Sequence, residues 1–341
     1  MERQGLDRVV LANPKTIYYF TGALTDALVP QVFTIDAAGR TLLVTNQQPR
    51  QAAADEVRLY TGYTIERPFN RTTMVREIAA LACLDGPAGI ETDFLPCGLG
   101  PGGADITPVI DDLRRIKDPD ELDSIRETIR LTEAGYRAVR GRIEPGMTEY
   151  EVYSMFHRAL VEHARTSVDL RGDFACGTRA IRGGGPPTDR RVQQGDLYIL
   201  DIFPFYNGYH CDLTRTFAVG SPTAAQQEAW QVIDEAHKKI ERIVRPGVMG
   251  RDIYREIQAH LEAHQPTCGS FWHHLGHGFG MNGWEFPWIT PGSDHVIQQG
   301  EALAIEPAVY GECIQGGIRI EHDYLVGPEG VTVLDSHPAE L

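Results

Sequence analysis

Residues 192–201, VQQGDLYILD, and residues 297–306, IQQGEALAIE, are two versions of one short sequence. Each begins with a polar turn, continues as an apolar run and ends on a carboxylate, Asp201 in the first and Glu306 in the second. The two carboxylates are separated by 105 positions. A chain that repeats a segment in this way is predicted to contain a duplicated structural unit.

The segments that precede these two stretches repeat as well. Residues 143–163 align with residues 244–264 at an offset of 101, and each block follows a predicted helix, at 119–142 and at 222–243 with Ser221 as its N-cap. Two copies are too few for a solenoid, so they predict a pseudo-two-fold domain with a site where the halves meet. The matching positions are Pro145/Pro246, Gly146/Gly247, Tyr153/Tyr254, Leu160/Leu261 and His163/His264.

The composition is that of an ordinary globular protein. The 341 residues are 42% hydrophobic and 23% charged, and the formal net charge is −15. This charge argues against nucleic acid and against an anionic membrane as partners, since both need basic patches. No apolar run approaches the roughly 20 residues of a membrane span, and no signal peptide is evident, so we expect a cytoplasmic protein. We therefore expect reduced thiols at Cys83, Cys97, Cys176, Cys211, Cys268 and Cys313.

The first part of the chain has a different pattern from the repeat. Short β-rich runs separated by turn residues, together with a helical pattern, predict a small α/β domain over residues 1–115. Asp118 and Pro119 form a helix start, which places a second domain at residues 116–341. The expected strands are residues 7–12, 16–22, 32–36 and 41–46, and the expected helix is residues 72–84.

The hairpin that follows Asp201 carries a second acid. Asn207-Gly208 is a strong signal for a two-residue turn, so we expect Tyr206 to pair with Tyr209. The same register pairs Phe203 with Asp212 and places Asp201, Phe203, Asp212 and Thr214 on one face. Two carboxylates then lie diagonally across one hairpin. The second copy supplies Glu306 and Glu321, so four carboxylates are predicted to converge.

Four converging carboxylates need cations. Burying one unpaired carboxylate costs several kcal/mol or forces it to take a proton. Arg215 and Arg319 are one source of charge, and two divalent metal ions are another. His277 lies between two glycines and adds a nitrogen donor, and a mixed nitrogen and oxygen set suits Mn, Fe, Co or Zn.

Four segments together resemble the pita-bread metallopeptidases, which include prolidase, aminopeptidase P and methionine aminopeptidase. The resemblance covers residues 112–330, and the first 110 residues resemble the smaller N-terminal domain of the prolidase and aminopeptidase P branch. It implies an α+β pita-bread catalytic domain with a pseudo-two-fold repeat, preceded by a creatinase-like α/β domain. The segments are LDIFPFYNGYHCDLTRTF (200–217), HHLGHGFG (273–280), AIEPAVY (304–310) and GIRIE (317–321).

The resemblance implies a ligand set for two divalent metal ions. Asp201 would chelate one ion, and Asp212 and Glu321 would bridge both. His277 and Glu306 would complete the ligands of the second ion. Glu306 would also exchange a proton with the bridging water. Manganese is the expected metal, with cobalt, iron and zinc as the alternatives.

Around the ligands, His273 follows the family pattern, whereas Trp284 and Arg182 depart from it. His273 matches a histidine of the proline-specific members with a catalytic or substrate-binding role, whereas His274 is expected to pack or to face solvent. Two histidines that normally contact the scissile peptide are absent. Trp284 stands at one position and is expected to line the substrate pocket. Arg182, in RAIRGGGPPTDRR (179–191), stands near the other as a candidate clamp for a substrate carboxylate. Arg319 and Thr214 are expected to contact the ligands rather than the ions.

Three functions follow, in order of preference. The first is a dinuclear metal hydrolase similar to Xaa-Pro dipeptidase or aminopeptidase P, in which a metal-bridged hydroxide attacks the scissile carbonyl and Glu306 passes the proton on. The second, motivated by the two absent histidines, is a non-peptidase metalloenzyme of the same fold that acts on a small amide or cyclic amidine. The third is a non-catalytic binding module. The resemblance also implies a homodimer.

Overall fold

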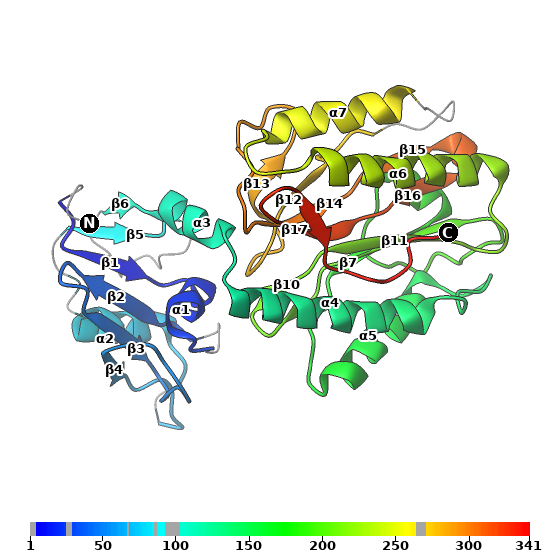
Figure 1. The fold of residues 1–341 in the computed structure, drawn as a ribbon. Helices are drawn as coiled ribbons and strands as arrows, with labels where there is room; N and C mark the ends of the chain where they lie inside the picture. Colours follow the sequence, from blue (N-terminus) through cyan, green and yellow to red (C-terminus); the bar gives the residue numbers. More distant parts are fainter. Residues whose placement is uncertain are drawn as a thin grey trace. The chain divides into compact units, whose positions relative to one another are not determined.

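The chain divides into two compact units, Met1–Leu113 and Arg114–Leu341 (Figure 1). Their structure comes from a computed structural model. It describes residues 5–24, 29–66, 68–82, 84, 87–92, 103–263 and 271–341. Within these ranges, none of the helices combines the length and the apolar character that a membrane span requires.

The first unit is built on a six-stranded mixed sheet with the order β4-β3-β2-β1-β5-β6. The strands expected at residues 7–12, 32–36 and 41–46 are confirmed as β1, β2 and β3, and the helix expected at residues 72–84 is α2. The elements are β1 (Arg8–Leu11), β2 (Val32–Asp36), β3 (Thr41–Thr45), β4 (Glu56–Leu59), α2 (Arg71–Ala82), β5 (Ala88–Ile90), β6 (Ala104–Asp105) and α3 (Thr107–Arg115).

The strand expected at residues 16–22 is wrong, because this segment lies in helix α1 (Pro14–Thr21). Its aromatic and β-branched residues favour a strand locally, but the helix start signals prevail. The Asn13 side chain accepts a hydrogen bond from the Lys15 amide, and proline occupies the first turn. Gly22 ends the helix in a left-handed conformation with φ of 66°.

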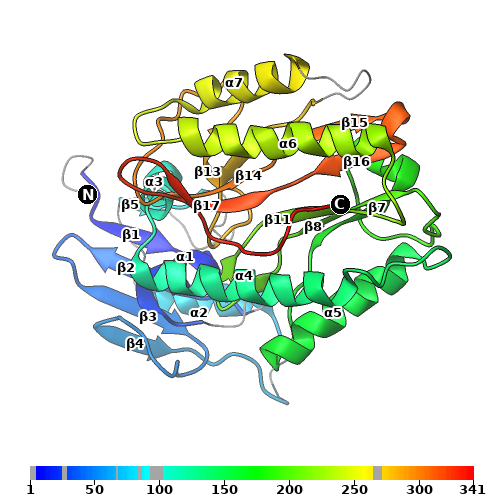
Figure 2. The same ribbon diagram turned by 45° about the vertical axis from the view of Figure 1, so that its right-hand side comes forward.

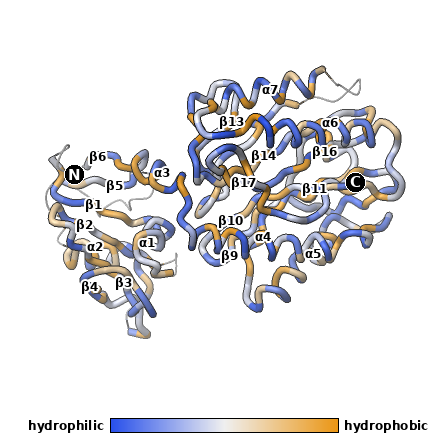
Figure 3. The backbone as a smooth tube through the Cα atoms, in the orientation of Figure 1, coloured by the Kyte–Doolittle hydropathy of each residue, from blue (hydrophilic) through white to orange (hydrophobic). Residues whose placement is uncertain are grey.

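The second unit places its helices in two pairs on opposite sides of the strands (Figures 1 and 2). Helices α4 (Pro119–Val139) and α5 (Glu149–Ala164) pack together on one side, and α6 (Ala224–Ile243) and α7 (Gly250–Ala263) on the other. The N-cap of α6 is Thr223 and not Ser221 as expected, because Thr223 forms a capping box with Gln226. Figure 3 shows hydrophobic and hydrophilic stretches alternating along α6 and α7, as helices with one buried face require.

The strands of the second unit repeat one order. In the first copy β11 (Leu213–Ala218), β8 (Leu197–Ile202) and β7 (Gly172–Cys176) form a three-stranded sheet. In the second copy the corresponding strands are β17 (His322–Val326), β14 (Ala302–Ile305) and β12 (Gly276–Gly278). These lie within the five-stranded sheet β13-β12-β14-β17-β18, with β13 at Glu285–Ile289 and β18 at Val331–Val333. Asp201 lies near the end of β8, and Glu306 directly follows β14.

The first hairpin keeps the expected register but is interrupted. Tyr206 pairs with Tyr209 between β9 (Phe205–Tyr206) and β10 (Tyr209–His210), and Asp201 pairs with Thr214 in the longer strands. The expected pair of Phe203 and Asp212 is wrong. The Phe203 amide donates to the Arg171 carbonyl and the Asp212 amide to Asp323, because Pro204 has no amide hydrogen to continue the ladder. The second hairpin carries its own short pair, β15 (Ala308–Gly311) and β16 (Gly316–Arg319).

The cysteines correct one expectation. Cys176 and Cys211 are free and buried, but Cys313 is disulfide-bonded, so the expectation of six reduced thiols is wrong for Cys313. Cys83, Cys97 and Cys268 lie outside the described residues.

Candidate functional site

A cavity of about 390 Å³ lies in the second unit and is lined by residues of both copies. It brings together all the site residues expected from the sequence except Thr214, which lies behind the ligands. The expected residues that line it are Arg182, Asp201, Asp212, His273, His277, Trp284, Glu306, Arg319 and Glu321.

One cluster of candidate ligands is completely buried. Asp212, His277 and Glu321 each offer a donor atom, and these three atoms lie within 4.8 Å of one another. His277 Nδ1 lies 3.0 Å from the Gly278 carbonyl oxygen, which can only accept, so this nitrogen carries the proton. The lone pair is therefore on Nε2, which lies 3.8 Å from Asp212 Oδ2 and 3.9 Å from Glu306 Oε1.

Two of the ligand candidates, Glu321 and Asp201, each contact a side chain of the opposite copy. Thr214, on β11, donates a 2.7 Å hydrogen bond to Glu321 Oε2. Arg319, at the end of β16, contacts Asp201 Oδ2 at 2.6 Å, and its Nε lies 3.8 Å from Glu306 Oε2. Both side chains therefore connect the copies across the cavity.

The carboxylates carry more negative charge than the protein neutralises. Burial raises the pKa of Asp201 to about 6 and of Glu306 to about 8, although Arg319 opposes both shifts. Burial and the neighbouring acids raise the pKa values of Asp212 and Glu321 well above the usual range.

Within the described part of the chain, Oδ1 of Asp201 and Oδ1 of Asp212 are buried without a hydrogen-bond partner. Buried polar atoms rarely lack one. Among the described residues, Arg319 is the arginine that contacts these carboxylates, and a single positive charge leaves their negative charge in excess. The oxygen donors and the imidazole of His277 therefore fit divalent cations.

Sequence reasoning missed three supporting residues. Asp173 pairs with Asp201 between β7 and β8, and its Oδ2 lies 2.9 Å from Arg319. Asp323 accepts the Asp212 amide at 3.2 Å. Tyr310 lies 3.1 Å from Arg319 through its hydroxyl group. The strand alternation could have indicated Asp323, two residues after Glu321, whereas Asp173 required knowledge of the neighbouring strand.

Arg215 does not neutralise the four carboxylates. Its guanidinium contacts Asp335 Oδ1 at 2.5 Å and the His337 carbonyl oxygen at 2.8 Å, and it donates to the Glu321 carbonyl oxygen at 2.6 Å. Arg215 therefore fixes the backbone behind the cavity and does not enter it.

His273 belongs to a directed chain of hydrogen bonds. Its Nδ1 donates to the His274 carbonyl oxygen at 2.6 Å, so its Nε2 accepts the Tyr310 hydroxyl at 2.9 Å. Tyr310 in turn accepts from Arg319. Both ring nitrogens of His273 are engaged, which fixes the ring at the cavity wall.

The mouth of the cavity carries two aromatic side chains and a positive charge. Trp284 is 62% exposed and Trp272 is 57% exposed. Arg182 ends a 3₁₀ helix at residues 177–182 and precedes Gly183. A Cβ atom at Gly184 would lie 1.9 Å from the Asp173 carboxylate, so only glycine allows this loop to pass the site so closely.

Comparisons with known proteins agree with this geometry. The Creatinase/Prolidase N-terminal domain matches residues 1–116, and the metallopeptidase family M24 matches residues 123–328. The chain is 28% identical to the Xaa-Pro dipeptidase of Pyrococcus furiosus over 100% of this chain and 97% of that protein.

Two solved structures are similar over nearly the whole chain. The prolidase from Pyrococcus furiosus has a TM-score of 0.85 at 25% identity, covering 99% of this chain and 98% of that one. The Xaa-Pro dipeptidase from Bacillus anthracis has a TM-score of 0.86 at 25% identity, covering 100% and 96%. These matches favour a peptidase over the non-peptidase alternative. The chain therefore belongs to the metallopeptidase family M24, and it is a divalent-metal-dependent hydrolase with the pita-bread fold.

Proposed function

We propose that this hydrolase cleaves the peptide bond of Xaa-Pro dipeptides. One observation carries the proposal, namely a buried set of four carboxylates and one imidazole in a cavity of dipeptide size. The full-length similarity to a protein named Xaa-Pro dipeptidase supports the substrate class.

We infer that Asp201, Asp212, His277, Glu306 and Glu321 would hold two divalent ions, with manganese as the first candidate for the oxygen-rich part of the set. Ions bound there would polarise a substrate carbonyl and lower the pKa of a water molecule. Thr214 and Arg319 keep the acids in position through their contacts with Glu321 and Asp201.

Glu306 is the proposed proton carrier. It lines the cavity, so its carboxylate is within reach of a water molecule bound there and can accept and release a proton. It would take a proton from the attacking water and pass it to the leaving nitrogen. His273, whose Nδ1 lies 3.9 Å from Glu306 Oε2, holds the adjoining wall.

The mouth of the cavity provides the proposed substrate contacts. The proline ring would pack against the indole of Trp284, which offers an apolar face beside His277 at a ring distance of 6.4 Å. The guanidinium of Arg182 would bind the C-terminal carboxylate of the dipeptide.

The test is hydrolysis of a panel of Xaa-Pro and Xaa-Gly dipeptides by protein loaded with Mn²⁺ or Co²⁺. We expect turnover of Xaa-Pro and at least a tenfold preference over Xaa-Gly. The Asp212→Asn variant serves as the control for contaminating peptidases. Absence of turnover by protein that contains its full complement of metal would contradict the proposal.

A further inference from the structure

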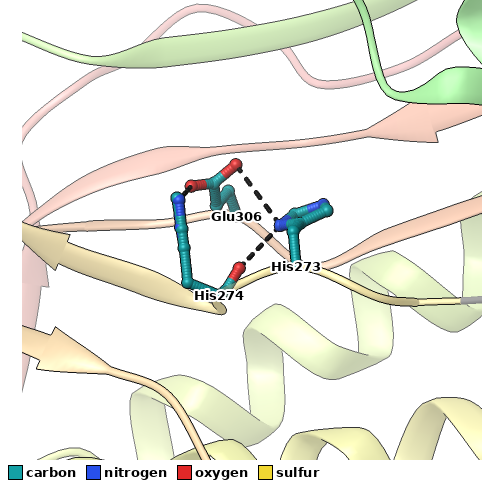
Figure 4. Close-up of side chains that lie close together, drawn as sticks. All are labelled: His273, His274 and Glu306. Carbon is teal, nitrogen blue, oxygen red and sulfur yellow. Dashed lines mark hydrogen bonds and ion pairs between the residues drawn. The ribbon is translucent and has the colours of Figure 1, made fainter.

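His274 faces the site although its neighbour His273 is the residue that the family pattern singles out. Its Nε2 lies 3.3 Å from Glu306 Oε1 (Figure 4). The same oxygen lies 3.9 Å from Nε2 of His277. One carboxylate oxygen of Glu306 therefore lies close to two imidazole nitrogens, and only one of these imidazoles belongs to the ligand set described above.

The ring nitrogens of His274 are both buried, and neither makes a hydrogen bond within the described part of the chain. The close approach to Glu306 is thus a contact without hydrogen-bond geometry. Two atoms that bind one ion at about 2.0–2.2 Å lie roughly 3–3.5 Å apart. The separation of His274 Nε2 and Glu306 Oε1, 3.3 Å, falls in this range, so the two atoms are spaced as two ligands of one cation would be.

His273 also lies close to His274 and Glu306, but both of its ring nitrogens already make hydrogen bonds. His273, His274 and Glu306 offer donor atoms within 4.8 Å of one another. His273, however, gives Nδ1–H to a carbonyl group and uses Nε2 to accept the Tyr310 hydroxyl (Figure 4 shows the first contact). Only His274 and Glu306 therefore retain donor atoms for a cation.

Aromatic neighbours fix the His274 ring. The ring centroids of His277 and Trp288 lie 5.4 Å and 5.3 Å away, and that of His273 lies 5.6 Å away. These contacts restrict rotation of the imidazole, so Nε2 is held toward Glu306 before any ion binds. A donor that packing holds in place in this way is preorganised as a ligand.

We propose that His274 is a ligand of the ion that Glu306 and His277 would hold, so that this position has two imidazoles. The proposal rests on the proposed metal centre and assigns it a ligand beyond the five described above. The two positions then differ in chemistry, because the acids around Asp201 supply oxygen alone whereas the Glu306 side is rich in nitrogen. Nitrogen donors favour Zn²⁺, Co²⁺ or Fe²⁺ over Mn²⁺ at the second position.

The test measures metal binding rather than turnover. Apo protein is titrated with Co²⁺, Zn²⁺ and Mn²⁺ against a competing chelator, and the Co²⁺ absorption bands are recorded. His274→Phe keeps an aromatic ring but removes both nitrogens, and His274→Asp supplies an oxygen donor instead. His163→Phe, at an exposed position on α5, controls for the loss of any histidine.

We expect two ions in the wild type and in His163→Phe. In His274→Phe, one ion should bind at least tenfold more weakly, with a larger loss for Zn²⁺ than for Mn²⁺ and with altered Co²⁺ bands. His274→Asp should recover part of the affinity. Unchanged affinities and spectra in His274→Phe would overturn the proposal.

Thermal unfolding separates a ligand from a packing residue. Removing two buried nitrogens without hydrogen bonds should leave the Tm of the apo protein unchanged or higher, while the rise in Tm on adding Zn²⁺ should shrink. A lower apo Tm with undiminished metal affinity would show that His274 only packs, and this result would also overturn the proposal.

A measurement on the wild type does not depend on any variant folding. X-ray absorption of protein loaded with two Zn²⁺ should show on average one imidazole per zinc, whereas a single histidine ligand gives one imidazole for every two. A wild type that binds no divalent ion would contradict the proposed function itself. A wild type that binds two ions with half an imidazole per zinc would contradict only the assignment of His274.

Discussion

The two copies of the repeat are alike in backbone and unlike in chemistry. Each contributes a strand that leads to one acid and a neighbouring segment that supplies another, Asp201 and Asp212 in the first copy and Glu306 and Glu321 in the second. The imidazoles that face the cavity all come from the second copy. In the first copy, β7 brings Asp173 to the same region, and its carboxylate is paired with Arg319. The symmetry brings two acids from each copy to the cavity. The histidines, which only the second copy adds to the lining, break this symmetry and supply the nitrogen donors.

The two buried arginines show the same contrast. Arg319, from the second copy, crosses to Asp201 and Asp173 in the first. Arg215, from the first copy, instead pairs with Asp335 in the C-terminal segment. One arginine therefore shares the charge of the cavity, and the other supports its back wall.

The strongest test of whether the two copies contribute equally to activity is to neutralise one matching acid in each copy. Asp212→Asn and Glu321→Gln keep the side-chain volume but remove one charge from each copy. We expect each to lower kcat/KM by about 10³-fold or more, beyond the roughly 10–100-fold loss typical of residues that only support a ligand. Peptidase assays and metal analysis of both variants check this. A tenfold difference or more between the variants would contradict an equal role for the two copies.

Replacing the arginines separates their roles. Arg319→Met and Arg215→Met each remove the arginine that pairs with a buried carboxylate, Asp201 or Asp335, which should cost about 3–5 kcal/mol in the free energy of unfolding of the apo protein. Added Zn²⁺ should restore most of this stability in Arg319→Met, because the ions neutralise Asp201. It should restore little in Arg215→Met, whose carboxylate lies outside the cavity. Urea unfolding with and without metal measures both effects.

The two acids at the matching strand ends, Asp201 and Glu306, should also titrate in different pH ranges. A carboxyl group whose pKa is raised on folding stabilises the folded state while it is protonated, and this contribution is lost as the pH rises through the folded value. Asp201 would lose it from pH 3.8 to about 6, and Glu306 from pH 4.5 to about 8. The free energy of unfolding of the apo protein should therefore fall by a few kcal/mol between pH 5 and 8.

Glu306→Gln tests the upper part of this range. It should reduce the fall in stability above pH 6 in urea unfolding of the apo protein, since the Glu306 carboxyl no longer loses a proton there. Metal-loaded wild type should show the opposite trend, because metal ions compete with protons for the same oxygens. A steep fall above pH 6 that persists in Glu306→Gln would assign the titration to another group.

The smallest expected effects concern substrate binding at the mouth. Arg182→Ala should raise KM about tenfold for dipeptides with a free C-terminal carboxylate and change it little for C-terminal amides. Trp284→Ala should raise KM about threefold to tenfold for both kinds of substrate, because it removes apolar contact rather than charge. Steady-state kinetics with the two substrate series distinguishes the contribution of each copy.

Much of this site follows from the sequence because the repeat encodes it. The register set by Asn207-Gly208 correctly opposes Asp201 to Thr214, and strand alternation places acids on one side. The partner of Arg215 could not be predicted, because Asp335 lies 120 positions away. The position of His274 beside Glu306 could not be predicted either. It depends on which of the two adjacent histidines makes hydrogen bonds with the protein, and the sequence does not show this. At residues 14–21 the aromatic and β-branched side chains predict a strand, but the capping residues Asn13 and Gly22 define a helix.

The contact between Arg215 and Asp335 links the segment around Asp335 to the proposed metal centre. Arg215 also donates a hydrogen bond to the Glu321 carbonyl oxygen. The Trp230 indole donates to the Ala339 carbonyl oxygen, and the Glu133 carboxylate accepts a hydrogen bond from the Ser336 amide. Loss of Asp335 by proteolysis would leave a buried guanidinium without its counter-ion directly behind Glu321. Cleavage before Asp335 is therefore expected to lower activity without altering a residue of the cavity wall.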